Sequence, residues 1–164
     1  MISRRTLLGT GLTAATAAAV IVAARAVGVL DDGLRVLGAE PHPEPDPGDT
    51  RRLRRAATAQ AVLIAALDAT TGEHGDLKSK LRPLRLVADE QLVAVGGRLD
   101  ATSAGPPPTD PRDAVAELAR LAAESAEARE DDAVSAASPD VARVLASMSA
   151  GLSQLARSFG LVTP

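Results

Sequence analysis

The fold class is decided by residues 138–160, which read SPDVARVLASMSAGLSQLARSFG. Ser138 and Pro139 are typical of a helix start, and Gly160 is typical of a helix end. Between them, apolar side chains recur at alternating intervals of four and three residues, which places them on one face of a helix that can pack beside others at a shallow angle. The segment therefore predicts one long helix of a bundle. Its predicted buried positions are Val141, Leu145, Met148, Leu152, Leu155 and Phe159.

Three further segments repeat this spacing, at residues 50–72, 77–95 and 110–137. Alanine and leucine, both strong helix formers, dominate all of them, whereas β-branched and aromatic residues are too few to build a sheet. The sequence therefore predicts an all-α fold, with a four-helix bundle over residues 50–160.

Helix boundaries follow from capping residues and from proline. Asp49 or Thr50 is the predicted N-cap of the first helix, and Pro83 predicts a kink or a restart in the second. The third helix is predicted to have Asp110 as its cap and Pro111 at its first position. The predicted seam of this third helix consists of Ala114, Leu118, Leu121, Ser125 and Ala128.

Connection lengths predict how the helices are joined. The links near residues 72–76 and 137–138 are short, so each predicts an antiparallel hairpin. The middle link, residues 98–110, reaches roughly 43 Å when extended, whereas a 21-residue helix is about 32 Å long. It is therefore long enough to cross the bundle. We expect two hairpins joined by a long crossover, which is a ferritin-like layout.

Charge supports the same arrangement. A basic cluster occupies the start of the first helix and an acidic cluster the end of the third, where the helix dipole disfavours each. A crossover brings both clusters to the same end of the bundle, where they compensate each other; the alternative is that each is separately solvated. The basic cluster is also a candidate partner surface. The clusters are Arg51, Arg52, Arg54 and Arg55, and Glu127, Glu130, Asp131 and Asp132.

Composition excludes several kinds of chemistry. Phe159 is the single aromatic residue, and the chain has no Trp, Tyr or Cys. There is consequently no disulfide framework, thiolate metal site or cysteine nucleophile, and no aromatic platform for stacking bases.

The first 26 residues are typical of an export signal. Paired arginines precede an uncharged apolar run that ends in a small-x-small sequence, the pattern of a twin-arginine signal with its cleavage site. An ordinary Sec-type signal is the alternative. The run is also close to the ~20 residues of a membrane-spanning helix, so an uncleaved N-terminal membrane anchor is a further alternative. The motif residues are Arg4, Arg5, Leu7 and Leu8, and the cleavage residues are Ala24 and Ala26.

Residues 27–49 form a proline-rich spacer between the signal and the bundle. Cleavage after Ala26 lowers the basic residues from 18 to 15 against 21 acidic ones, so the net charge becomes −6. An acidic exported domain is a poor nucleic-acid binder, and we expect no nucleic-acid partner. The partner that the export motif predicts is the twin-arginine export machinery.

Short stretches of the helices resemble a family of small exported bacterial ferritin-like proteins. They lie at residues 65–69 (AALDA), 81–85 (LRPLR) and 136–147 (AASPDVARVLAS), and the likeness extends over about residues 50–159. The resemblance implies a di-iron site with one Glu from each of two helices and a Glu-x-x-His from each of the others.

The residues for such a site are missing. The chain has two histidines, His42 in the spacer and His74 in a turn, and no Glu-x-x-His. We therefore expect no metal ligands, no cofactor and no catalytic residues. The predicted middle of the bundle holds a polar layer of Gln60, Gln91 and Ser125. It is interpreted as a layer that sets helix register, or alternatively as a vestigial site or small polar pocket.

These observations favour a non-enzymatic exported or membrane-tethered bundle protein of the cell envelope, with a structural or interaction role. One alternative is a degenerate di-iron oxidoreductase, with Glu124, Glu90 and Asp89 near the old site. Another is a carrier of a small apolar ligand, because alanine-rich helix seams open easily.

Overall fold

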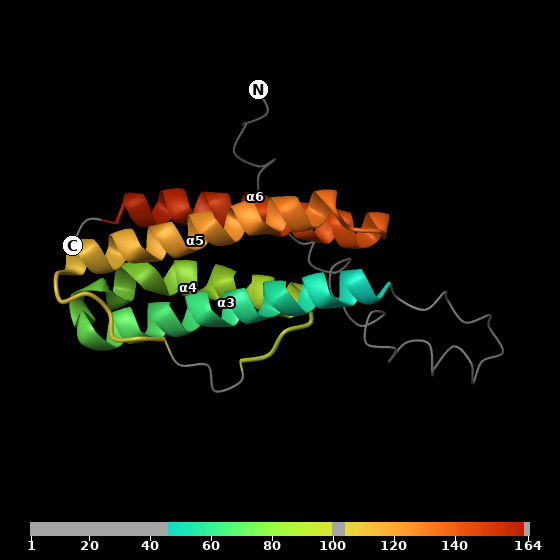
Figure 1. The fold of residues 1–164 in the computed structure, drawn as a ribbon. Helices are drawn as coiled ribbons and strands as arrows, with labels where there is room; N and C mark the ends of the chain where they lie inside the picture. The colour runs from blue at the N-terminus through green and yellow to red at the C-terminus, as the bar shows by residue number, and fades with distance from the viewer. Residues whose placement is uncertain (1–45, 100–103, 163–164) are drawn as a thin grey trace, which may run out of the picture.

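The computed structural model describes residues 46–99 and 104–162 (Figure 1). Within them the chain forms four α-helices, one short 3-10 helix and no β-strand, so the predicted all-α helical fold is confirmed. No described helix combines the length and apolar character needed to cross a membrane. The predicted export motif, cleavage residues and most of the spacer lie outside the described residues. The elements are α3 (Pro47–Glu73), η1 (Gly75–Leu77), α4 (Lys78–Ala94), α5 (Pro111–Val134) and α6 (Pro139–Gly160).

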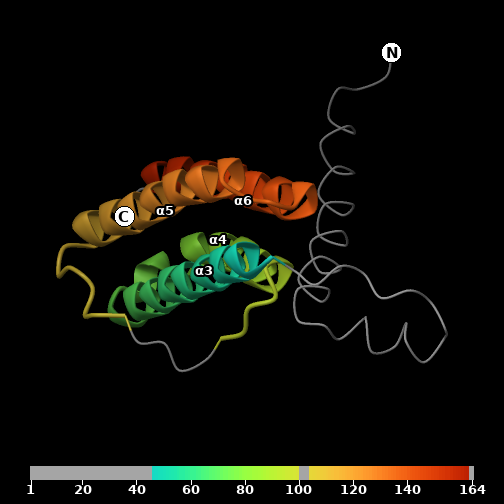
Figure 2. The same ribbon diagram turned by 45° about the vertical axis from the view of Figure 1, so that its right-hand side comes forward.

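The helices form two pairs stacked as two layers, with α3 beside α4 and α5 beside α6 (Figures 1 and 2). The α5–α6 pairing is the most extensive helix–helix contact in the described structure. Leucine side chains from every helix fill the space between the layers, and Phe159 is fully buried among them. Other fully or almost fully buried core residues are Leu63, Ile64, Leu67, Leu81, Leu118, Leu145 and Leu152.

Polar contacts at both ends define how α3 lies against α5. Near the start of α3, Arg55 is 2.5 Å from the Asp132 carboxylate near the end of α5. Beyond the end of α3, Nε2 of His74 donates to the Pro108 carbonyl, which precedes α5, at 2.9 Å. Helices α3 and α5 therefore run antiparallel.

The predictions for α6 agree closely with the structure. It extends from Pro139 to Gly160, and all six predicted seam residues are buried. The α3 boundary differs, because the helix begins at Pro47 rather than at Asp49 or Thr50. Proline is tolerated in the first turn of a helix, and the Asp46 side chain caps the turn by accepting the Asp49 amide.

Two other predictions were wrong. Helix α5 ends at Val134 rather than Ala137, and its buried face shifts in the second half to Ala122 and Ala126. Ser125 is consequently half-buried. A straight helix drifts relative to a strict 3-4 repeat, so a seam extrapolated from one end of a long helix moves off the core.

Pro83 does not divide the second helix, because α4 is continuous from Lys78 to Ala94. After the last helical residue, Ala94, the chain turns at Gly96, whose φ of 72° is the left-handed conformation that glycine adopts without strain. The Gly96 amide bonds the Val93 carbonyl, and the Gly97 amide bonds the Leu92 carbonyl. These two hydrogen bonds together form the Schellman motif, which commonly ends helices.

Candidate functional site

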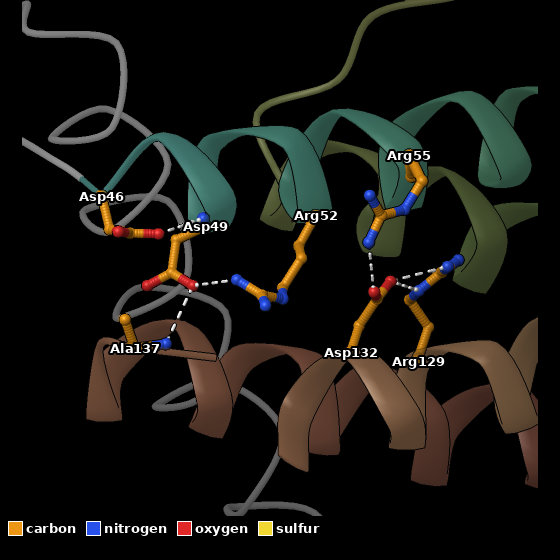
Figure 3. Close-up of polar contacts among 7 residues, drawn as sticks. All are labelled: Asp46, Asp49, Arg52, Arg55, Arg129, Asp132 and Ala137. Carbon is orange, nitrogen blue, oxygen red and sulfur yellow. Dashed lines mark hydrogen bonds and ion pairs between the residues drawn. The ribbon is translucent and has the colours of Figure 1, made fainter. Parts of the chain in front are cut away.

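The most polar buried region lies where the start of α3 meets the turn between α5 and α6 (Figure 3). Asp49 is 2% exposed there. Its carboxylate accepts the backbone amides of Ala137 at 3.0 Å and Ser138 at 2.8 Å, and Nη1 of Arg52 at 3.0 Å. Ser138 is the N-cap of α6, and its own side chain makes no capping bond. Asp49, which belongs to the α3–α4 hairpin, thus binds the backbone amides at the start of α6 in the other hairpin.

A second buried carboxylate, that of Asp132, lies near the end of α5 and faces α3. Asp132 accepts Nε and Nη2 of Arg129 at 3.1 and 2.9 Å on one oxygen, and Nη2 of Arg55 at 2.5 Å on the other (Figure 3). Arg129 is only 4% exposed. A buried guanidinium requires a close counter-ion, because an unpaired charge is strongly unfavourable away from water. Asp132 therefore neutralises Arg129 and also joins α5 to α3.

We call Asp49, Arg52, Arg55, Arg129 and Asp132 the ionic end. Two of its members, Arg52 and Arg55, belong to the predicted partner surface, and the structure places their guanidinium groups in ion pairs. The other two arginines of that surface, Arg51 and Arg54, are exposed and form no ion pair with another described residue.

The acidic cluster divides in the same way. Asp132 is buried and paired, whereas Glu127, Glu130 and Asp131 are exposed. The predicted meeting of basic and acidic clusters thus takes place through the Arg55–Asp132 pair. The sequence named Asp49 only as a cap of its own helix, so its contact with Ala137 and Ser138 was not predicted, and Arg129 was not predicted at all. The signal for Arg129 was its place three residues before Asp132, a spacing that allows an ion pair on one helix face.

Two residues of the predicted polar layer, Gln60 and Gln91, are hydrogen-bonded to each other. Nε2 of Gln60 donates to Oε1 of Gln91 at 3.0 Å and to the Ala88 carbonyl at 2.9 Å. Gln60 is fully buried, and its Oε1 atom has no hydrogen-bond donor among the described residues. Gly151 on α6 makes room for this amide, because a Cβ there would lie 2.4 Å from Nε2 of Gln91.

Ser125 does not join the two glutamines in any hydrogen bond of the described structure. The buried hydroxyl between α5 and α6 belongs instead to Ser149, which donates to the Ala126 carbonyl at 2.8 Å. The amide layer therefore joins α3 to α4, and a separate serine contact joins α5 to α6. The sequence signal for Ser149 was its place beside Met148, at the edge of the correctly predicted α6 seam.

The three acidic residues of the di-iron alternative are not brought together. Glu124 pairs with Arg120 on α5, and Asp89 pairs with Arg85 on α4. Glu90 is exposed. Among the described residues, no group of three or more His, Cys, Asp or Glu side chains is placed to hold a metal ion.

Two surface ion pairs alter acid–base properties. The hydrogen bond from Arg85 to Asp68 raises the pKa of the Arg85 guanidinium, with Asp89 adding to the effect and burial opposing it. The hydrogen bond from Arg120 lowers the pKa of Glu117 below its usual range. Both effects keep the side chains charged near neutral pH. The partners are surface ion pairs: Arg85 with Asp68 and Asp89, and Arg120 with Glu117.

Comparison with known proteins adds no assignment to this site. No family model, no curated protein and no solved structure matches the chain.

Proposed function

We propose that this chain is a non-enzymatic helical-bundle protein, exported or membrane-tethered, with a structural or interaction role in the cell envelope. The observation that carries the proposal is the ionic end. Its two buried carboxylates are fully engaged: Asp49 with two backbone amides and Arg52, and Asp132 with two arginines. Groups so engaged hold helices together and are poorly suited to act as a general base or a metal ligand.

The ferritin-like layout belongs to this proposal. Support comes from the two ends of α3, since Arg55 contacts Asp132 and His74 contacts Pro108. If α3 is antiparallel to both α4 and α5, the link from Val95 to Asp110 returns along the bundle and makes α4 parallel to α5. Two hairpins joined by a crossover have this geometry.

The proposed export from the cytoplasm rests on sequence alone. Its basis is Arg4 and Arg5 before an apolar run, and the Ala24–Ala26 cleavage pattern. N-terminal sequencing of the protein recovered from the envelope fraction tests it. A start at Val27 supports a cleaved signal, and an intact N-terminus in the membrane pellet supports an anchor. Recovery of intact chain from the cytoplasm overturns the proposed location.

Metal analysis tests the absence of a di-iron role. The full chain is expressed with iron or manganese in the medium, and bound metal is measured per chain after gel filtration. We expect less than stoichiometric metal, with no change on Glu124→Ala. Stoichiometric metal that is lost in Glu124→Ala, with the fold retained by circular dichroism, overturns the non-enzymatic assignment.

A further inference from the structure

Helix α4 presents one continuous face to solvent. Leu86 and Val93 are each 56% exposed on it, a large exposure for apolar side chains one heptad apart. The exposed positions are spaced by threes and fours, as in the seams that pack helices against one another. We call this set the α4 outer face. It consists of Ser79, Arg82, Pro83, Leu86, Glu90 and Val93.

The charges on the α4 outer face are unpaired and symmetrically placed. Arg82 lies four residues before Leu86, and Glu90 lies four residues after it. Neither forms a hydrogen bond or an ion pair with another residue in the described part of the chain. Their neighbours Arg85 and Asp89, by contrast, pair with each other. One positive and one negative charge thus flank the exposed leucine without partners.

We propose that the α4 outer face binds a second copy of this chain, with the two α4 helices antiparallel and Leu86 at the two-fold axis. In that register Arg82 lies opposite the partner's Glu90, and symmetry repeats the pair on the other side. Val93 then lies against the partner's Ser79 and the partner's Pro83. The charge pattern selects this orientation. A parallel pair sets Arg82 against the partner's Arg82 and Glu90 against the partner's Glu90, which is repulsive.

The contact is a single helix pair, so the dimer is a weak one that forms with rising concentration. Leu86 is its central apolar contact, and the paired charges supply orientation more than affinity. The proposal does not depend on where the chain resides. It is therefore tested separately from the proposed function.

Sedimentation of the purified full chain over a range of concentrations is the first test. We expect a monomer–dimer equilibrium, which Leu86→Asp weakens by about thirtyfold or more. The matched control is Leu161→Asp, at an apolar side chain that is 83% exposed at the end of α6 and outside the α4 outer face. A chain that stays monomeric throughout overturns the proposal. So does an association that Leu86→Asp leaves unchanged while circular dichroism shows an intact fold.

Charge reversal tests the orientation. Arg82→Glu alone and Glu90→Arg alone each place like charges in opposition and weaken the dimer. An equal mixture of the two single variants restores association, because both cross-pairs then become attractive, and the double variant restores it as well. Single variants that associate as strongly as the natural chain overturn the antiparallel register, because a parallel pair already sets like charges in opposition.

Cysteine crosslinking locates the axis, and the natural chain has no Cys to interfere. Under mild oxidation Leu86→Cys gives a covalent dimer, since the two sulfurs meet across the axis within disulfide reach. Val93→Cys does not, because Val93 faces the partner's Ser79. Efficient crosslinking through Val93→Cys as well as through Leu86→Cys indicates a parallel pair, in which every position faces its own copy, and overturns the proposal.

Discussion

The ionic end and the middle of the bundle bury polar groups in opposite ways. At the ionic end, Asp49 and Asp132 are charged and receive several donors from elements far apart in sequence. In the middle, Gln60 and Gln91 are neutral amides that bond within a single hairpin. Charged groups therefore join the two hairpins, and the two neutral amides join the helices of a single hairpin.

This difference has an energetic consequence. Removing one member of a buried ion pair leaves an uncompensated charge, whereas removing one of two amides leaves a neutral group with lost hydrogen bonds. The ionic end should be the more sensitive of the two regions. Single substitutions that remove one partner at a time test that ranking.

Asp132→Ala should have the largest effect, because it leaves Arg129 buried without a counter-ion. We expect a loss of about 3–5 kcal/mol in the free energy of unfolding, measured by urea denaturation. Arg55→Ala is the matched control, since that side chain is 57% exposed, and it should cost less than about 1 kcal/mol. Equal losses in the two variants would show that the exposed Arg55–Asp132 pair contributes as much to stability as the buried Arg129–Asp132 pair.

Asp49→Ala should come next, with a loss of about 2–3 kcal/mol, because two backbone amides and Arg52 lose their acceptor. Asp49→Asn keeps one accepting oxygen and should lose less. Amide hydrogen exchange at Ala137 and Ser138 is the local measurement, and both amides should exchange faster in Asp49→Ala. Unchanged protection there would contradict the assigned role of Asp49 at the start of α6.

The middle of the bundle is tested through Gly151. In the natural chain Gly151→Ala should be close to neutral, because the helix-propensity gain of about 1 kcal/mol is offset by displacement of the Gln91 amide. In a Gln91→Ala background the same change should stabilise by about 1 kcal/mol. Thermal unfolding of the four proteins in this double-mutant cycle gives the coupling. Zero coupling would mean that Gly151 does not accommodate Gln91.

The smallest effect belongs to the surface pair of Glu117 and Arg120. Arg120 lowers the pKa of Glu117 in the folded chain, so the stabilisation is present above the unfolded pKa and is lost as pH falls through the folded one. Arg120→Ala should raise the pKa of Glu117, observed by NMR titration. Added salt should weaken the natural shift, since both groups are exposed. A Glu117 titration that Arg120→Ala leaves unmoved would contradict this account.

The sequence predicted α6 most completely. Its start, its end and all six seam residues agree with the structure, because strong apolar periodicity coincides with clear caps. It predicted the second half of α5 less well: Ala128 is exposed and Leu121 only partly buried against the core, whereas Ala122 and Ala126 are buried. Alanine-rich stretches offer several equally good seams, and local pattern alone does not choose among them.

The candidate site was predicted in part for the same reason. Gln60 and Gln91 lie on the predicted apolar seams of α3 and α4. Their hydrogen bond therefore follows once these two helices pack against each other. Arg129 and Asp132 share a helix face, but the second ion pair of Asp132 is made with Arg55 on α3. That depends on how two separate hairpins meet, which helical periodicity does not encode.

The sequence by itself determined the helical class, most helix boundaries and the absence of thiol and aromatic chemistry, because these depend on residue type and on spacing within a few turns. Only the tertiary structure decided the role of Asp49. Local sequence places it as a cap for its own helix, whereas the fold turns its carboxylate to the start of α6, 88 residues away. Long-range contacts of this kind arise from packing between hairpins, so they appear only when the chain is folded.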